Sequence, residues 1–185
     1  MSNVIFVAGD RVTLRPIEEA DLDFLTEGVN HPEVRPFVGQ PFPTSVARER
    51  RYLEELNERT DAVAVLAVAG DERVGVVEFD PVDREAGVAD LAIWMHPDHH
   101  GSGYGSEATE LMLDYAFDEL RVHKVTAEAY DVNAASRGLL ESIGFTREGV
   151  GREDAFFDGE HRDTHYYGVL EGEWRDREEP GENDE

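Results

Sequence analysis

Residues 91–108, LAIWMHPDHHGSGYGSEA, join a β-rich run to a helix through a glycine-rich loop. The run that ends at Met95 is typical of a strand, and apolar residues in 106–119 recur at the spacing of an amphipathic helix. Three glycines lie between 101 and 105. Glycines let backbone N–H groups approach an anion closely, and a helix N-terminus adds the positive end of its dipole. The segment therefore predicts a binding site for a diphosphate.

Two common phosphate-binding folds do not match this loop. A Walker A loop would continue with Gly-Lys-Ser or Gly-Lys-Thr, which is absent here. A dinucleotide-binding fold would need wider glycine spacing and parallel βαβ flanks, whereas the flanking runs predict antiparallel strands. The loop therefore belongs to another class of phosphate-binding protein.

Working outward, the predicted elements alternate between strands and helices around this loop. The predicted strands are 11–17, 62–69, 73–79, 86–95, 122–130, 145–156 and 162–170; the predicted helices are 18–28, 45–59, 106–119 and 134–143. Gly70-Asp71 and Asp158-Gly159 predict hairpin turns, and four prolines make 30–43 a loop with at most one helical turn. Thr44 or Ser45 is the predicted N-cap of the helix that follows this loop. We expect an α+β fold with a mostly antiparallel sheet and flanking helices. Residues 1–172 are expected to form one domain, and 173–185 an acidic, disordered tail.

Composition excludes several classes of function. The chain has 185 residues, 42 Asp and Glu, 17 Lys and Arg, and a formal net charge of −25. Such a charge disfavours binding to nucleic acid or to an anionic membrane, because both need clustered Lys and Arg. Without cysteine there is no disulfide and no thiol nucleophile. The first residues have no basic segment typical of a signal peptide, so we expect a cytoplasmic protein.

The basic residues also carry information. Lys124 is the only lysine, and the other 16 basic residues are arginines. A chain that is rich in acids and poor in strongly hydrated lysine is typical of proteins adapted to multimolar salt, in which acidic self-repulsion is screened. We therefore expect a halophilic origin; the alternative is an ordinary acidic cytosolic protein.

Three blocks of sequence resemble the GNAT acetyltransferases, whose acetyl-CoA loop has the pattern Gln/Arg-x-x-Gly-x-Gly/Ala. Here the loop begins with His100 and matches both glycine positions. Residues 133–145, NAASRGLLESIGF, resemble the Asn-x-x-Ser and Gly-Phe positions of the family. Residues 147–163 are similar to the end of RimJ/RimL-type protein N-terminal acetyltransferases and of spermidine acetyltransferases.

The resemblance implies a set of acetyl-CoA-binding residues. It implies a GNAT-like sheet with a splayed strand pair. Backbone groups at the splayed end of the strand would pair with pantetheine, the glycine loop would hold the diphosphate, and an asparagine would bind the pantetheine arm. The residues implied for acetyl-CoA binding are Trp94, Met95, His96, His100, Gly101, Ser102, Gly103, Tyr104, Gly105, Ser106, Asn133 and Ser136. His96, His99 and His100 do not have the spacing of a zinc site, so no metal is predicted.

The thiolate that leaves needs a proton donor. Ser136 lies where RimL-type enzymes have a serine proposed for this role, while many other family members use a tyrosine at the position of Leu140. Leucine cannot donate a proton, so Ser136 is the predicted acid and Tyr130 is the alternative.

The amine that attacks needs a base. The RimL-type acid is replaced by Ala155, which leaves Glu153 and Asp154 as neighbours and Glu78 and Asp90 as acids of the sheet. Glu78 follows an apolar run and is the predicted base or amine ligand.

The resemblance implies an acetyl-CoA-dependent N-acetyltransferase, acting as a monomer or homodimer. The expected acceptor is a protein or peptide N-terminal amine, with a polyamine or another small amine as the alternative. A non-catalytic acyl-CoA-binding module and an enzyme of nucleotide phosphates are the competing functions; the latter would need a lysine or metal ligands near the loop.

Overall fold

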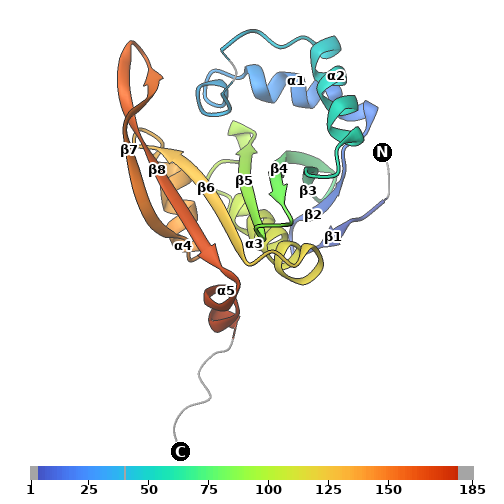
Figure 1. The fold of residues 1–185 in the computed structure, drawn as a ribbon. Helices are drawn as coiled ribbons and strands as arrows, with labels where there is room; N and C mark the ends of the chain where they lie inside the picture. Colours follow the sequence, from blue (N-terminus) through green and yellow to red (C-terminus); the bar gives the residue numbers. More distant parts are fainter. Residues whose placement is uncertain (1–3, 40, 179–185) are drawn as a thin grey trace, which may run out of the picture.

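The computed structural model describes residues 4–39 and 41–178 (Figure 1). Its strands are β1 (Val7–Ala8), β2 (Thr13–Pro16), β3 (Val63–Ala69), β4 (Glu72–Asp83), β5 (Val88–Met95), β6 (Lys124–Tyr130), β7 (Thr146–Phe157) and β8 (Glu160–Leu170). Its α-helices are α1 (Leu22–Asn30), α2 (Val46–Glu58), α3 (Tyr104–Tyr115), α4 (Ala134–Ser142) and α5 (Glu171–Glu178). The elements at Glu19–Asp21, Arg35–Phe37 and Pro97–His99 are 3₁₀ turns, and Ala116–Leu120 is a π-helical turn.

The described strands form one sheet in the order β1-β2-β3-β4-β5-β6-β8-β7. Its pairs are antiparallel except β5 with β6, which α3 connects as a crossover. The parallel pairing runs only from Val88 opposite Lys124 to Leu91 opposite Ala127. Beyond that register the two strands separate, as Figure 1 shows. The predicted α+β class with a mostly antiparallel sheet is therefore confirmed.

Alternating side chains of the central strands bury both faces of the sheet. On β3, Val65 and Ala67 join the core that includes Met112 and Leu113 of α3. Leu66, between them, joins a second cluster with Leu25 of α1. Because successive strand residues point to opposite faces, one apolar run serves both helix layers. Helices α1 and α2 therefore cover one face of β3–β5, while α3 covers the other.

Local sequence signals placed most elements correctly. The Ser45 side chain accepts a hydrogen bond from the Arg48 N–H and caps α2, as its position predicted. Gly70 adopts the left-handed conformation between β3 and β4, and the Asp158-Gly159 turn joins β7 to β8. Strand β1 was not predicted, because a two-residue strand has no periodicity and depends on its partner.

The expectation of a tail from residue 173 needs correction. Residues up to Glu178 belong to α5, and the Trp174 ring is buried. The indole N–H of Trp174 donates to the Asp114 carboxylate of α3 at 2.7 Å. This apolar anchor orders a segment whose acidic composition suggested disorder. Residues 179–185, the rest of the predicted tail, lie outside the described residues.

Candidate active site

The glycine-rich loop connects β5 to α3 with two left-handed residues. Gly101 has φ +72° and Gly103 has φ +79°, a region that side chains with a Cβ rarely adopt. Gly103 is the N-cap of α3, so the helix begins at Tyr104. The predicted stretch from Gly101 to Ser106 is therefore a tight turn followed by the first helical turn. The backbone N–H groups of such a first turn have no partner within the helix and suit an anion.

Close packing continues under the loop. A Cβ on Gly105 would stand 3.1 Å from a Leu139 methyl group of α4 and 3.4 Å from the Met95 side chain. A larger residue at this position would therefore push α3 away from α4. The absence of a side chain at Gly105 thus allows α3, α4 and β5 to pack closely.

Two of the three histidines near the loop make hydrogen bonds to neighbouring strand residues. The His100 ring nitrogen Nε2 donates to the Met95 carbonyl at 2.9 Å, so its side chain turns back toward the strand. The His96 N–H donates to the Val74 carbonyl of β4 at 2.8 Å. That hydrogen bond removes the His96 N–H from the predicted pantetheine donors, and Trp94 likewise pairs with Val76 on β4. Among the described residues, no group of three or more metal-ligand side chains stands together.

A cavity of about 640 Å³ opens beside the separated ends of β5 and β6. Helices α1 and α2, strands β4–β6 and the start of α4 form its walls. The predicted residues that line it are Glu78, Asp90, Trp94, Tyr130, Asn133 and Ser136. The loop residues 95–106 do not line it. The residues predicted to be catalytic, together with Trp94 and Asn133 of the predicted acetyl-CoA contacts, thus line the cavity, whereas the other predicted acetyl-CoA residues belong to the loop segment.

Glu78 lies on β4 with its carboxylate in this cavity. Burial raises its pKa, and a hydrogen bond from the Tyr52 hydroxyl opposes that shift. The Tyr52 oxygen lies 3.2 Å from Glu78 Oε2, reaching across from α2. A carboxylate with a raised pKa is a better proton acceptor for an amine than an ordinary surface acid.

Further carboxylates face the same cavity. Burial raises the pKa of Asp90 on β5, and burial together with the charges of Asp90 and Asp154 raises the pKa of Glu128 on β6. Burial also raises the pKa of Glu49 on α2. In total, five carboxylates and two guanidinium groups line the cavity. Its surplus of acids suits a positively charged ligand.

Two hydroxyl groups stand at the α4 end of the cavity. Ser136 lies in the first turn of α4, where its N–H donates to the Asn133 side-chain oxygen at 3.1 Å. This N-cap bond engages the Asn133 oxygen and leaves its amide N–H groups to donate elsewhere. Tyr130 is the last residue of β6, and its ring packs edge-on against the Phe157 ring with the two ring centres 4.6 Å apart. Burial and the charges of Glu128 and Asp154 raise the Tyr130 pKa and keep it protonated.

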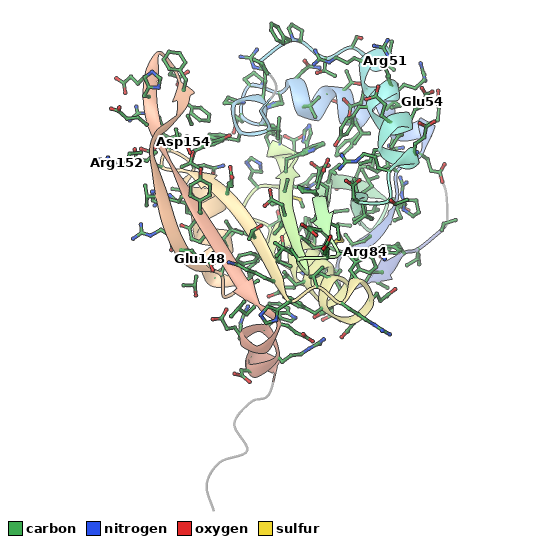
Figure 2. All side chains as sticks on the ribbon, in the orientation of Figure 1. Arg51, Glu54, Arg84, Glu148, Arg152 and Asp154 are labelled. Carbon is green, nitrogen blue, oxygen red and sulfur yellow. The ribbon has the colours of Figure 1, made fainter. Side chains whose placement is uncertain are left out.

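The acids nearest to Ala155 do not enter the cavity. Asp154 accepts a hydrogen bond from the Tyr166 hydroxyl, and Glu153 donates its N–H to the Asp163 carboxylate at 2.9 Å. Figure 2 shows Asp154 on the β7–β8 hairpin, across from Arg51 on α2. Of the four acids considered from the sequence, Glu78 and Asp90 are therefore the ones that line the cavity.

Sequence reasoning missed Tyr52 and Glu49, two of the cavity residues on α2. A signal existed, because Glu49, Tyr52, Leu53 and Leu56 recur at helical spacing and define the inner face of this helix. Their polar members were hidden among the many charged residues of α2. Nothing in the sequence indicated that this face would lie over Glu78.

The structure thus combines a parallel β5–β6 pair that separates, a glycine-rich loop at the N-terminus of α3, and a cavity lined by carboxylates. Residues 11–146 match the acetyltransferase (GNAT) domain, and the chain belongs to this family. It is an acetyltransferase enzyme of a family that uses acetyl-CoA to acetylate amines.

Individual relatives span nearly the whole chain. The chain is 29% identical over 171 residues to the uncharacterized N-acetyltransferase p20 of Bacillus licheniformis, covering 89% of this chain and 96% of the relative. It is 25% identical to the spermidine N(1)-acetyltransferase of Vibrio cholerae, over 91% of this chain and 98% of the relative. A structure of spermidine N-acetyltransferase from Vibrio cholerae with CoA and spermine superposes with a TM-score of 0.85 at 22% identity, covering 89% of this chain and 98% of that chain.

In the described part of the chain, no helix is long and apolar enough to span a membrane.

Proposed function

We propose that this acetyltransferase transfers the acetyl group of acetyl-CoA to a primary amine of a polycationic small molecule such as a polyamine. The observation that carries the proposal is the surplus of carboxylates in the cavity next to the separated β5 and β6. A monoamine brings one positive charge, whereas a polyamine can occupy several carboxylates at once. Similarity to spermidine acetyltransferases supports the same acceptor class.

The cavity residues suggest a division of roles. The amine nitrogen attacks the thioester carbonyl carbon, so that a C–N bond forms as the C–S bond breaks. Glu78, whose pKa is raised by burial, takes the proton that the amine loses, directly or through a water molecule. Ser136 or Tyr130 donates a proton to the departing sulfur. The products are an N-acetylated amine and CoA thiol.

A second acceptor class has its own support. The candidate ribosomal N-acetyltransferase YdaF of Bacillus subtilis is 27% identical over 176 residues, covering 89% of this chain and 94% of the relative. The sequence likewise favours an N-terminal amine, through the resemblance of residues 147–163 to RimJ/RimL-type enzymes. A peptide would bring one α-amine and an extended backbone instead of several amines. Acceptor specificity therefore separates the two candidates.

The test is thiol release with spermidine, a basic peptide with an unblocked N-terminus, and propylamine. We expect spermidine to give the highest kcat/KM. Glu78→Gln should lower kcat by about 10²-fold or more, the range for loss of a general base. Glu54→Gln is the matched control, because Glu54 is exposed on the same helix as Tyr52 and does not line the cavity (Figure 2). A higher kcat/KM for the peptide would favour the N-terminal acceptor.

Binding of acetyl-CoA without acetyl transfer to any of these amines would instead support a non-catalytic acyl-CoA-binding module. Calorimetry of acetyl-CoA with the same protein sample decides between an inactive preparation and such a module.

A further inference from the structure

Arg11, in the turn between β1 and β2, lies against the glycine-rich loop although it is far away in sequence. Its Nη1 donates to the Ser102 carbonyl at 3.1 Å. Its guanidinium carbon lies 5.3 Å from the centre of the Tyr104 ring. A Cβ added to Gly103 would lie 3.0 Å from the Arg11 Nη2. The guanidinium therefore extends along the N-terminal end of α3.

Glu107 holds this arginine in place. One carboxylate oxygen accepts the backbone N–H groups of Arg11 and Val12 at 2.7 and 2.9 Å, and the other accepts Arg11 Nε at 3.1 Å. Burial alone would raise the Glu107 pKa, but these hydrogen bonds lower it, so the carboxylate stays charged. The turn and the side chain are thus fixed before any ligand arrives. Little conformational entropy remains to be lost when the guanidinium meets an anion.

The loop itself supplies no permanent cation. Residues 96–106 contain neither Lys nor Arg, and the His100 ring is hydrogen-bonded to the Met95 carbonyl. The resembling family pattern places Gln or Arg at the position of His100. A diphosphate bound by backbone N–H groups in a chain of net charge −25 would gain from a fixed positive charge nearby.

We propose that Arg11 is a phosphate-binding residue for acetyl-CoA, with its guanidinium contacting the diphosphate that the loop holds. The arginine that the loop lacks would then come from the β1–β2 turn. This inference rests on acetyl-CoA as the co-substrate and on the loop as its phosphate site. The side chain is 55% exposed, so a ligand can reach it. Arginine suits the role because its planar fork pairs with phosphate oxygens.

The experiment compares wild type with Arg11→Ala, Arg11→Lys and the control Arg84→Ala. Arg84 is exposed in the turn before β5, at the opposite end of that strand from the loop, and its removal costs the same charge. Binding of CoA and 3′-dephospho-CoA is measured by calorimetry, and binding of pantetheine, which has no phosphate, by competition. We expect Arg11→Ala to weaken both CoA forms about tenfold, the low end for a hydrogen bond to a charged group at a partly exposed site.

We expect Arg11→Lys to show a smaller loss, and Arg84→Ala and all pantetheine measurements to match wild type. The proposal is overturned if Arg11→Ala binds CoA as tightly as wild type. It is also overturned if pantetheine weakens to the same extent, because Arg11 would then act only on loop structure. If Arg11→Ala lowers the affinity for CoA but not for 3′-dephospho-CoA, the proposed contact with the diphosphate is refuted. Wild-type protein that binds no CoA would instead refute the loop as the phosphate site.

Discussion

Replacing Tyr52 with Phe removes one hydroxyl group and keeps the aromatic ring of α2 over the acceptor cavity. The lost group is the donor that lies 3.2 Å from Glu78 Oε2. This hydrogen bond stabilises the Glu78 carboxylate against burial, which raises its pKa. Without the donor, the Glu78 pKa rises further. A larger share of the enzyme then carries a protonated Glu78 that cannot accept a proton from the amine.

The size of the effect follows from the geometry. A single hydrogen bond of this length at a half-exposed tyrosine contributes about 1 kcal/mol, which is about a fivefold change in an equilibrium. On the acidic limb of the pH profile, kcat/KM should therefore fall about fivefold. Above the limb both enzymes have an ionised Glu78, and their rates should converge. The limb moves to higher pH because loss of the donor disfavours the carboxylate.

The assay is thiol release with spermidine across the pH range in which the enzyme remains folded. Tyr166→Phe is the matched control, because the Tyr166 hydroxyl also donates a hydrogen bond to a carboxylate, that of Asp154. The Tyr166→Phe substitution should leave the pH midpoint of the acidic limb unchanged. If Tyr52→Phe lowers kcat/KM by the same factor at every pH, Tyr52 contributes to binding and the proposed control of Glu78 is wrong.

Three further predictions concern the leaving group, the buried charges and salt. Ser136→Ala should lower kcat about 10²-fold with little change in the acetyl-CoA KM, whereas a wild-type kcat when chemistry limits turnover would transfer the role to Tyr130 or water. Asp21→Asn should cost about 3–5 kcal/mol in urea unfolding, because the buried Asp21 pairs with Arg15 and Arg73 at 2.7 and 2.6 Å; an unchanged midpoint would refute this. Burial opposes ionisation of Asp21, but these partners lower its pKa from the ordinary value of 3.8 to about 2. The ionised Asp21 therefore stabilises the fold fully above pH 3.8, and this stabilisation is lost as the pH falls from 3.8 through about 2. The melting temperature should rise steeply from low to multimolar KCl, and a flat dependence would contradict the halophilic origin.

The sequence predicted features that depend on neighbouring residues. Ser45 caps a helix through the N–H three residues later, and the Asp158-Gly159 turn joins adjacent strands. The separation of β5 from β6 was expected from family resemblance alone, because no local pattern says where a parallel pair stops. The glycine loop was recognised because its composition, strand and helix are contiguous in the chain.

Contacts between distant segments were beyond the reach of sequence patterns. Tyr52 and Glu78 are 26 residues apart, and Arg11 and Ser102 are 91 residues apart. In a chain with 42 acidic and 17 basic residues, nothing in the sequence distinguishes these residues from ordinary polar residues of the surface. Trp174 shows the same limit, because its acidic neighbours suggested a disordered tail while its burial against α3 depends on tertiary packing.

The proposal that the acid-lined cavity binds a polycationic acceptor is tested most directly by one ratio, that of kcat/KM for spermidine to kcat/KM for propylamine. The ratio is measured in wild type and in an Asp90→Asn, Glu128→Gln double variant. Both substitutions keep a side-chain oxygen and remove a negative charge from the cavity. We predict that wild type prefers spermidine by at least about tenfold, since each added ion pair contributes up to about 1 kcal/mol, and that the double variant loses most of this preference. An equal ratio in the two enzymes would contradict the assignment of these carboxylates to a polycationic acceptor.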